Sequence, residues 1–286
     1  MINIYDRKNK KLITEEQYAS SILNFLYNNV VGRILLKLLI LPFISKIYGI
    51  YQTSFLSKKH IKGFIKQYQI DESKYEETNY KSFNDFFTRK LKKENLPKKQ
   101  KNNIVISPAE SKLLVYKITK DLKVNIKGST YTLEELTKEK VSKDYINGNC
   151  LIFRLSVNNY HRYCHIDNGE LIKTKLIKGK LHTVSSISQN YKIYKENKRV
   201  VSILKTENLD EIIYIEVGAL LVGDIKNYNQ EKFKKGEEKG YFNVGGSTIV
   251  ILTKDNIKID KDIIKYSNEG IETLLEYGER IGETKC

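Results

Sequence analysis

A glycine pair opens the most β-like apolar run of this chain. Residues 245–252 read Gly-Gly-Ser-Thr-Ile-Val-Ile-Leu. Gly-Gly favours a tight turn, and the β-branched residues after it favour a buried strand. The same step suits self-cleavage of the backbone, because Gly246 has no Cβ and lets the Ser247 hydroxyl approach its carbonyl carbon. On this motif alone the turn is the simpler interpretation, so companion motifs must decide.

Six other short blocks precede this step along the chain. They are Phe83–Leu91, Ile106–Lys112, Asn159–Arg162 with Asp167–Gly169, Gly179–Leu181, Asn197–Val201 and Val217–Gly223. Together with Gly245–Thr248, and in this order, they resemble the phosphatidylserine decarboxylase family. Proenzymes of that family cut themselves at a Gly-Ser bond and convert the new N-terminal serine into a pyruvoyl group. The resemblance covers roughly residues 80–255.

The resemblance implies a self-processing carboxy-lyase that needs no external cofactor. Cleavage between Gly246 and Ser247 would give a β chain, residues 1–246, and an associated α chain, residues 247–286, that begins with a pyruvoyl group made from Ser247. That ketone would form a Schiff base with phosphatidylserine and accept the electron pair left by departing CO2. The product would be phosphatidylethanolamine.

Two histidines are candidates for the base that a serine nucleophile needs. Residues 160–165 read Tyr-His-Arg-Tyr-Cys-His, and either a strand or a helical turn would put His161 and His165 on one side. We expect His60 and His182 to be structural or to face water. In the family, one histidine of this segment serves cleavage and another assists proton transfer during decarboxylation; the sequence does not apportion these roles.

Two residues depart from the family pattern. The second histidine usually comes three positions after the first, whereas here Cys164 fills that position and is an alternative proton donor. Glu110 stands where the family has an aspartate, and it can still orient an imidazole. Its extra methylene moves the carboxylate outward by about 1.5 Å. Misplacement on that scale can cost roughly a hundredfold in rate, so slow self-cleavage is an open outcome.

An aromatic segment supplies one more candidate. Phe83, Phe86 and Phe87 recur at helical spacing, which is typical of a core-facing helix. Arg89 follows them, and its guanidinium fork suits the phosphate oxygens of a lipid. We therefore expect the phenylalanines in the core and consider Arg89 a candidate phosphate contact.

The N-terminal part of the chain combines apolar helical periodicity with positive charge. Residues 15–70 read as helical, and residues 34–44 are the most hydrophobic segment but too short to span a bilayer. Cationic residues surround it, and the whole chain carries a formal net charge of +16. This pattern favours an interfacial helix on an acidic membrane, peripheral and on the cytoplasmic face. An ordinary core-packed helix and a lysine-rich composition are the alternatives.

A lysine-rich segment at residues 92–103 separates this helical part from recurring short β-type runs. The predicted organisation is therefore α+β, with a helical membrane-associating region at 1–95. A mostly antiparallel β catalytic domain with a short C-terminal helix follows at 96–286. Three cysteines, Cys150, Cys164 and Cys286, lack the spacing of a disulfide framework or a zinc site, and we predict reduced thiols and no metal. The N-terminus has no signal-peptide pattern.

Three rival functions follow from the same features. A non-catalytic homologue that binds acidic lipids fits Glu110 and Cys164. A pyruvoyl decarboxylase of a soluble amino acid fits the cleavage motif but not the apolar segment. A nucleic-acid-binding protein fits the charge alone, and we expect no nucleic-acid partner because no recognition motif accompanies it. A homodimer is possible; the sequence does not specify the oligomeric state.

Overall fold

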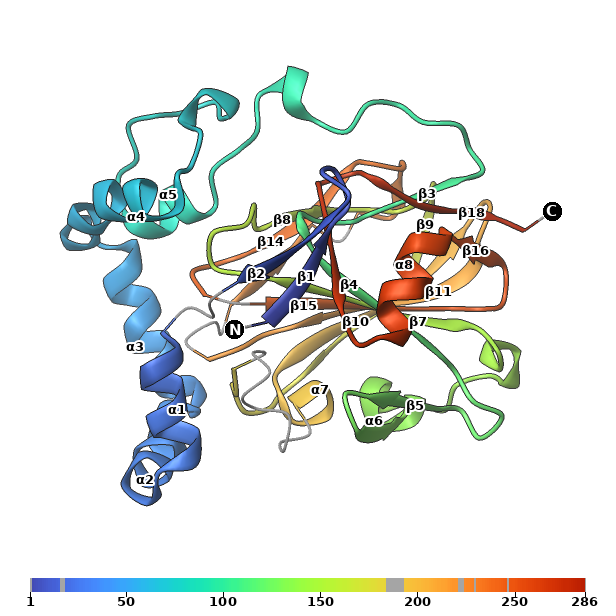
Figure 1. Cartoon of the computed structure of the whole chain (residues 1–286), viewed down its shortest axis with the longest axis horizontal. Helices are drawn as coiled ribbons and strands as arrows, with labels where there is room; N and C mark the ends of the chain where they lie inside the picture. Colours follow the sequence, from blue (N-terminus) through green and yellow to red (C-terminus); the bar gives the residue numbers. More distant parts are fainter. Residues whose placement is uncertain are drawn as a thin grey trace.

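The N-terminal helices gather at one end of the molecule, and strands with a few short helices make up the rest (Figure 1). The computed structural model describes residues 2–15, 19–183, 193–220, 224–228, 230–245 and 247–285. Helices follow one another from residue 20 to residue 68, whereas residues from 104 onward are mostly antiparallel strands. The predicted α+β class is confirmed.

One large sheet dominates the described residues. Its ten strands are, in spatial order, β13 (Lys232–Phe233), β9 (Gly169–Ile177), β10 (Arg199–Thr206), β11 (Asp210–Val217), β15 (Ser247–Thr253), β7 (Asn149–Leu155), β4 (Ser111–Lys117), β17 (Glu272–Leu275), β1 (Ile2–Asp6) and β2 (Lys11–Glu15). Neighbours run antiparallel except β1 and β17, which are parallel. Because β1 and β17 come from opposite ends of the chain, this sheet joins the two termini.

Smaller sheets and short helices surround the large sheet. The sheets are β12 (Ile225–Asn227) with β14 (Glu238–Phe242) and β8 (Arg162–Cys164), β16 (Ile257–Ile259) with β18 (Arg280–Thr284) and β3 (Ile104–Ile106), and β5 (Lys123–Ile126) with β6 (Ser129–Thr132). The short helices are α6 (Leu133–Thr137), α7 (Ile193–Glu196) and α8 (Lys261–Asn268), with 3-10 turns at Glu72–Lys74, Lys93–Asn95 and Lys143–Tyr145. The sheet of β8 and β14 matters most for function, because His161 and His165 flank β8.

The strand that begins with Ser247 lies inside the large sheet. β15 pairs with β11 on one side and β7 on the other, and all seven of its residues are buried. A strand covered on both faces reads as a continuous apolar run, which explains why Ile249–Leu252 carry no polar alternation. The apolar run after the glycine pair is therefore a buried central strand, as the sequence predicts.

The N-terminal helices form a layer with an unusual surface. They are α1 (Ser20–Asn28), α2 (Val30–Leu39), α3 (Pro42–Thr53), the 3-10 helix Phe55–His60, α4 (Ile61–Tyr68) and α5 (Phe83–Phe87). Gly32 lets α2 cross closely over α1, since a Cβ there would lie 2.0 Å from the Phe25 carbonyl oxygen. Asn29 caps α2 by accepting from the Val31 backbone N–H.

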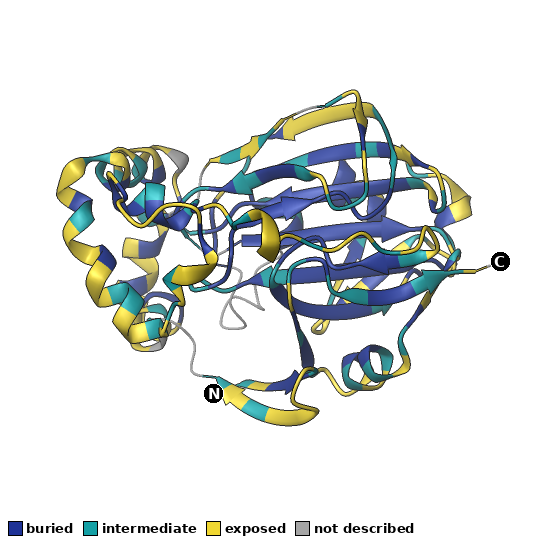
Figure 2. Ribbon diagram, turned by 90° about the horizontal axis from the view of Figure 1, so that it is seen from above, coloured by how far each residue is buried: buried dark blue, intermediate teal, exposed yellow. Residues whose placement is uncertain are grey.

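Large apolar side chains of this layer face outward, and Figure 2 shows exposed positions all along these helices. We call them the helical apolar surface: Ile22, Val30, Val31, Ile34, Leu38, Phe43, Ile47, Ile50, Phe55 and Leu56, each at least half exposed. No single described helix is long and apolar enough to cross a bilayer, and α1 with α2 meets that test only as a pair bent by 100°.

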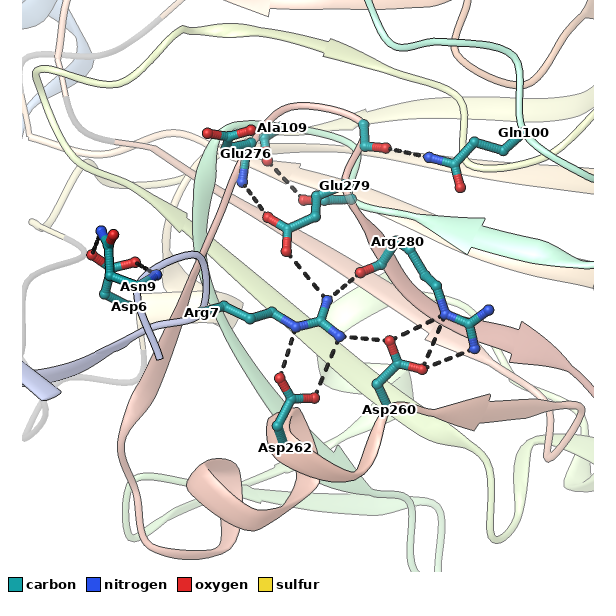
Figure 3. A network of polar contacts seen from close by, with 12 residues as sticks. Asp6, Arg7, Asn9, Gln100, Ala109, Asp260, Asp262, Glu276, Glu279 and Arg280 are labelled. Carbon is teal, nitrogen blue, oxygen red and sulfur yellow. Dashed lines mark hydrogen bonds and ion pairs between the residues drawn. The ribbon is translucent and has the colours of Figure 1, made fainter. Parts of the chain in front are cut away.

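Residues 247–285 are interleaved with the rest of the chain rather than attached at its edge. β15 lies between β11 and β7, β17 between β4 and β1, and β18 pairs with β3 as well as with β16. Figure 3 shows a second connection, in which the Arg7 guanidinium binds Asp260 at 2.6 Å and Asp262 at 2.7 Å. A fragment starting at Ser247 would therefore stay bound after cleavage.

Two details differ from the sequence-based expectation. Residues 2–15, assigned to the helical region, form the hairpin β1–β2, because pairing with β17 buries Ile4 and Tyr5 in the sheet. The predicted short C-terminal helix is α8, Lys261–Asn268, but two further strands, β17 and β18, follow it. The proposed division between residues 95 and 96 stays a prediction.

Candidate active site

The predicted cleavage step lies where the chain enters β15. Ser247 is fully buried, and its Oγ has no hydrogen-bond partner among the described residues. Gly245 has φ of +131°, a conformation that side chains with a Cβ disfavour. Gly246 lies outside the described residues. Ser45, Thr248 and Thr273 also carry buried hydroxyls without a partner among the described residues, so this feature singles out Ser247 only together with its place directly after the glycine pair.

His161 is buried beside this step. Its Nδ1 lies 2.8 Å from the Asn159 carbonyl oxygen, an acceptor that assigns the proton to Nδ1 and leaves the lone pair on Nε2. Burial lowers the pKa of His161 to about 3, against smaller raising contributions from the Asn159 and Gly245 backbones. The Phe242 backbone N–H donates to the His161 carbonyl oxygen at 3.0 Å, which places His161 beside the segment that leads to the cleavage step. At neutral pH His161 is therefore uncharged, as a general base must be.

Helix α5 covers both parts of this site. The Phe87 ring lies 4.0 Å from the His161 ring, centroid to centroid. Phe83, Phe86 and Phe87 are buried in one apolar cluster with Val244, which precedes the glycine pair. The prediction that these phenylalanines are core residues is confirmed, and the core they build supports the imidazole and the segment before Ser247.

Glu110 contacts the loop that carries His161, not an imidazole. Its Oε1 accepts from the Asn159 side-chain amide at 2.7 Å, and its Oε2 accepts from the Tyr160 backbone N–H at 3.2 Å. Asn159 is also the residue whose carbonyl holds His161 Nδ1. Glu110 thus acts on His161 through one intermediate residue, Asn159. The sequence predicted a direct contact between Glu110 and an imidazole; in the structure, Glu110 instead holds the loop that carries His161.

The structure separates His165 from His161. His165 stacks on Phe233 with ring centroids 3.6 Å apart, and burial, together with the Lys239 charge, lowers its pKa to about 2. None of the described contacts of His161 is shared with it. Cys164 is fully buried, and burial raises the pKa of its thiol to about 12, which disfavours it as the alternative proton donor.

Arg89 is buried rather than on the surface. Its side chain is 3% exposed, and its guanidinium donates to the Phe86 and Asn158 carbonyl oxygens at 3.4 and 3.3 Å. The same group lies over the Tyr75 ring. These contacts fix the loop before His161, so the structure gives Arg89 a supporting position in place of the predicted contact with a lipid phosphate.

Comparison with known proteins decides the family. Residues 83–283 match the family described as phosphatidylserine decarboxylase. The chain belongs to the phosphatidylserine decarboxylase family. It is 53% identical to "Phosphatidylserine decarboxylase proenzyme 2" of Clostridium acetobutylicum over 287 residues, 99% of each chain. It is 43% identical to a phosphatidylserine decarboxylase proenzyme of Clostridium botulinum over 295 residues, all of both chains, and 41% identical to one of Clostridium tetani.

Family membership identifies the cofactor, and the placement of possible ligand side chains addresses metals. Proenzymes of the phosphatidylserine decarboxylase family generate a pyruvoyl group from a serine, which agrees with the predicted cofactor. The buried, unpaired hydroxyl of Ser247 at a strand start fits that role. Within the described ranges, no group of three or more His, Cys, Asp or Glu side chains is placed to hold a metal ion.

Sequence reasoning missed a buried ion pair near His165. Glu216 and Lys239 bind each other at 0% and 5% exposure, and Lys239 Nζ also contacts Ser202 Oγ at 3.3 Å. Glu216 lies opposite Ile249 of β15, two residues after Ser247. A charged residue inside the apolar run 212–217 was the available signal, since such residues are rarely buried without a partner.

Proposed function

We propose that this protein is a phosphatidylserine decarboxylase whose proenzyme cuts itself between Gly246 and Ser247. The observation that carries the proposal is the pairing of two buried groups at one step. Ser247 Oγ lacks a partner among the described residues, and the ring of the neutral His161 packs on Phe87, which belongs to the same buried cluster as Val244, three residues before Ser247. A nucleophile and a base at a glycine-rich step are the components that acyl transfer requires.

We propose the following cleavage steps. His161 Nε2 takes the Ser247 hydroxyl proton while Oγ bonds to the Gly246 carbonyl carbon. The Gly246–Ser247 C–N bond then breaks as His161 returns the proton to the departing nitrogen, which leaves an ester and a free amine at residue 247. Loss of the Ser247 Cα proton expels the Gly246 carboxylate, and water then replaces the nitrogen, which leaves as ammonia, to give the pyruvoyl group. Glu110 holds Asn159, and Asn159 holds the His161 ring, so both act by orientation.

The decarboxylation step uses the same buried region. The pyruvoyl carbonyl supplies the electron sink for the pair released when the substrate carboxylate leaves as CO2. The substrate carbon then needs a proton, for which His161 and His165 are the candidates. We assign cleavage to His161, whose ring packs on Phe87 in the same cluster as Val244. The protonation step stays unassigned, because the low pKa values of His161 and His165 leave neither imidazole charged at neutral pH.

The test of self-cleavage is the intact mass of purified protein under denaturing conditions. We expect two chains, the smaller having 40 residues and an N-terminus blocked as pyruvoyl. The Ser247→Ala variant should stay one chain. A wild-type protein that remains uncut but binds acidic liposomes would favour the non-catalytic homologue. Competition between phosphatidylserine and free serine as substrates would separate the lipid enzyme from a decarboxylase of a soluble amino acid.

Membrane association follows from the helical apolar surface. Its side chains are exposed beside Arg33, Lys37, Lys46, Lys58, Lys59 and Lys62. An apolar face with a cationic rim binds acidic lipid surfaces, because burial of apolar area and attraction to anionic headgroups act together. We propose that the protein sits peripherally on the cytoplasmic face of the cell membrane with this surface inserted.

Vesicle flotation tests the membrane proposal. We expect binding to vesicles that contain phosphatidylserine, and weaker binding to phosphatidylcholine vesicles or at high salt. Equal recovery with both lipids at all salt concentrations would remove the electrostatic part of the proposal. No recovery with either lipid would remove the proposal as a whole.

A further inference from the structure

We propose that Asn84 is a positioning residue for self-cleavage, which holds the backbone before the glycine pair in the geometry that Ser247 attacks. This inference rests on the proposed cleavage at Gly246–Ser247. Asn84 is half buried on α5, far from residue 244 in the sequence, and takes no part in bond making.

Both ends of the Asn84 amide contact the segment before the cleavage step. Its Oδ1 accepts from the Val244 backbone N–H at 3.1 Å. Its Nδ2 donates to Asn243 Oδ1 at 3.0 Å. Asn243 is held in turn by Asp224, through its side chain at 2.8 Å and its backbone N–H at 3.2 Å. The segment is therefore anchored at two successive residues.

The helix that carries Asn84 is itself rigidly held. Ser82 caps it by accepting from the Asp85 backbone N–H at 3.2 Å, and the Phe83 N–H donates to Ser57 Oγ at 2.9 Å. Phe86 and Phe87 are fully buried. A side chain on such a helix can define the position of a loop that has no regular structure of its own.

Helix α5 thereby contacts both the segment before the cleavage step and the proposed base. Asn84 holds the segment that leads to the carbonyl under attack, and Phe87 packs against the base, His161. Two consecutive glycines leave that segment free to adopt many conformations, and Gly245 is in one that only glycine adopts readily. A fixed hydrogen bond just before them restricts this freedom, and displacements of about 1 Å cost roughly a hundredfold in rate.

The test compares first-order cleavage rates of freshly refolded variants by mass spectrometry. We expect Asn84→Ala to slow cleavage at least tenfold, because the Val244 N–H loses its acceptor. Asn84→Asp keeps that acceptor and should recover the rate to within about fivefold of wild type. Asn84→Ser, whose side chain is too short to reach Val244, should be as slow as Asn84→Ala and serves as its replacement if the alanine variant does not fold.

The matched control is the neighbouring Asp85→Ala. Asp85 Oδ2 accepts from the Lys81 backbone N–H at 2.8 Å and supports α5 without any described contact to residues 243–244. It should lower the melting temperature but leave the cleavage rate within twofold. Equal slowing by Asp85→Ala, or unchanged cleavage in both Asn84→Ala and Asn84→Ser, would overturn the inference. A wild-type chain that is not cut at Gly246–Ser247 would instead overturn the proposed function.

Discussion

The large sheet and the N-terminal helices differ in how far their apolar side chains are exposed to solvent. Every residue of β15 is buried, whereas Val30, Ile34 and Leu38 of α2 are each more than half exposed. The central strands of the sheet bury their apolar side chains within the chain, whereas the outlying strands β2 and β9 expose Leu12, Ile172 and Leu176. The helices expose the ten side chains of the helical apolar surface, and exposed apolar patches mark interaction sites. The two regions therefore differ in how far the chain itself covers their apolar side chains, and the proposed membrane contact concerns the second region.

The two regions also differ in whether their charged side chains form ion pairs. In the sheet, Arg154 binds Glu272, and Lys127 binds Glu272 at 3.0 Å, with Glu272 only 3% exposed. Around the helical apolar surface, Arg33, Lys37 and Lys46 have no ion pair within the described residues. Buried charges need partners inside the protein, whereas surface cations remain available to anionic headgroups. The comparison thus separates a region whose buried charges are paired within the protein from a region whose cations have no ion pair among the described residues.

The largest expected effect is on the catalytic side of this comparison. His161→Ala should slow self-cleavage by about 10²- to 10⁴-fold, because Ser247 loses its base. In the wild type, burial keeps the pKa of His161 near 3, so the imidazole is already neutral above that pH. The cleavage rate should therefore be flat between pH 5 and 8, followed by mass spectrometry. An inflection near pH 6.5 would mean that His161 titrates as if exposed.

The same substitution in the two regions should have different consequences. Ile249→Glu places a charge in the fully buried β15, and we expect loss of several kcal/mol of stability or failure to fold. Leu38→Glu places it on a side chain that is 57% exposed, so unfolding free energy should change by about 0.5 kcal/mol or less. Vesicle flotation should nevertheless fall for Leu38→Glu. A large loss of stability there would show that α2 packs on protein instead.

Acid should destabilise the sheet through Glu272. Burial alone would raise the pKa of this carboxyl, but Arg154 and Lys127 outweigh burial and lower it to about 2. A carboxylate with a depressed pKa contributes stability above its unfolded pKa of about 4.5, and that contribution is lost as pH falls towards 2. The amount is on the order of 3 kcal/mol. Circular dichroism during denaturant unfolding at several pH values measures it.

Glu272→Gln is the control for that measurement. It removes the titrating group, so the slope of stability against pH between 4.5 and 2 should flatten. Stability at pH 7 should also fall, because Arg154 is left buried without its carboxylate. An unchanged slope in this variant would assign the acid sensitivity to other carboxylates.

A smaller loss of stability than at Glu272 is expected at the connection between the two termini. Arg7→Ala removes the ion pairs with Asp260, Asp262 and Glu279, but the Arg7 side chain is 17% exposed and partly solvated. We expect a loss of about 1 to 2 kcal/mol. The 40-residue fragment should still co-elute with the larger chain after cleavage, because β15 remains between β11 and β7. Release of the fragment would show that Arg7 carries its retention.

Several features were predictable because they depend on local sequence. Gly245–Leu252 predicts a turn and a buried strand, since chain flexibility and β-branching act within a few residues. Helical periodicity before residue 70 and β-type runs after residue 104 likewise gave the α+β class. The choice of His161 followed from the resemblance of residues 159–162 to the family. Each of these conclusions concerns neighbours along the chain.

Other features were decided only by tertiary packing. Residues 2–15 form strands because β1 pairs with β17, some 270 residues later in the chain. Arg89 is buried, and its guanidinium donates to the Asn158 carbonyl oxygen. Glu110 reached Asn159, and Asn84 reached Val244, across 49 and 160 residues. The sequence by itself determined the buried strand and the fold class, since these follow from local preferences, and it proposed Ser247 as the nucleophile from a family resemblance. Which distant groups meet depends on how the sheet closes, because long-range contacts form only when packing outweighs the entropy of bringing the segments together.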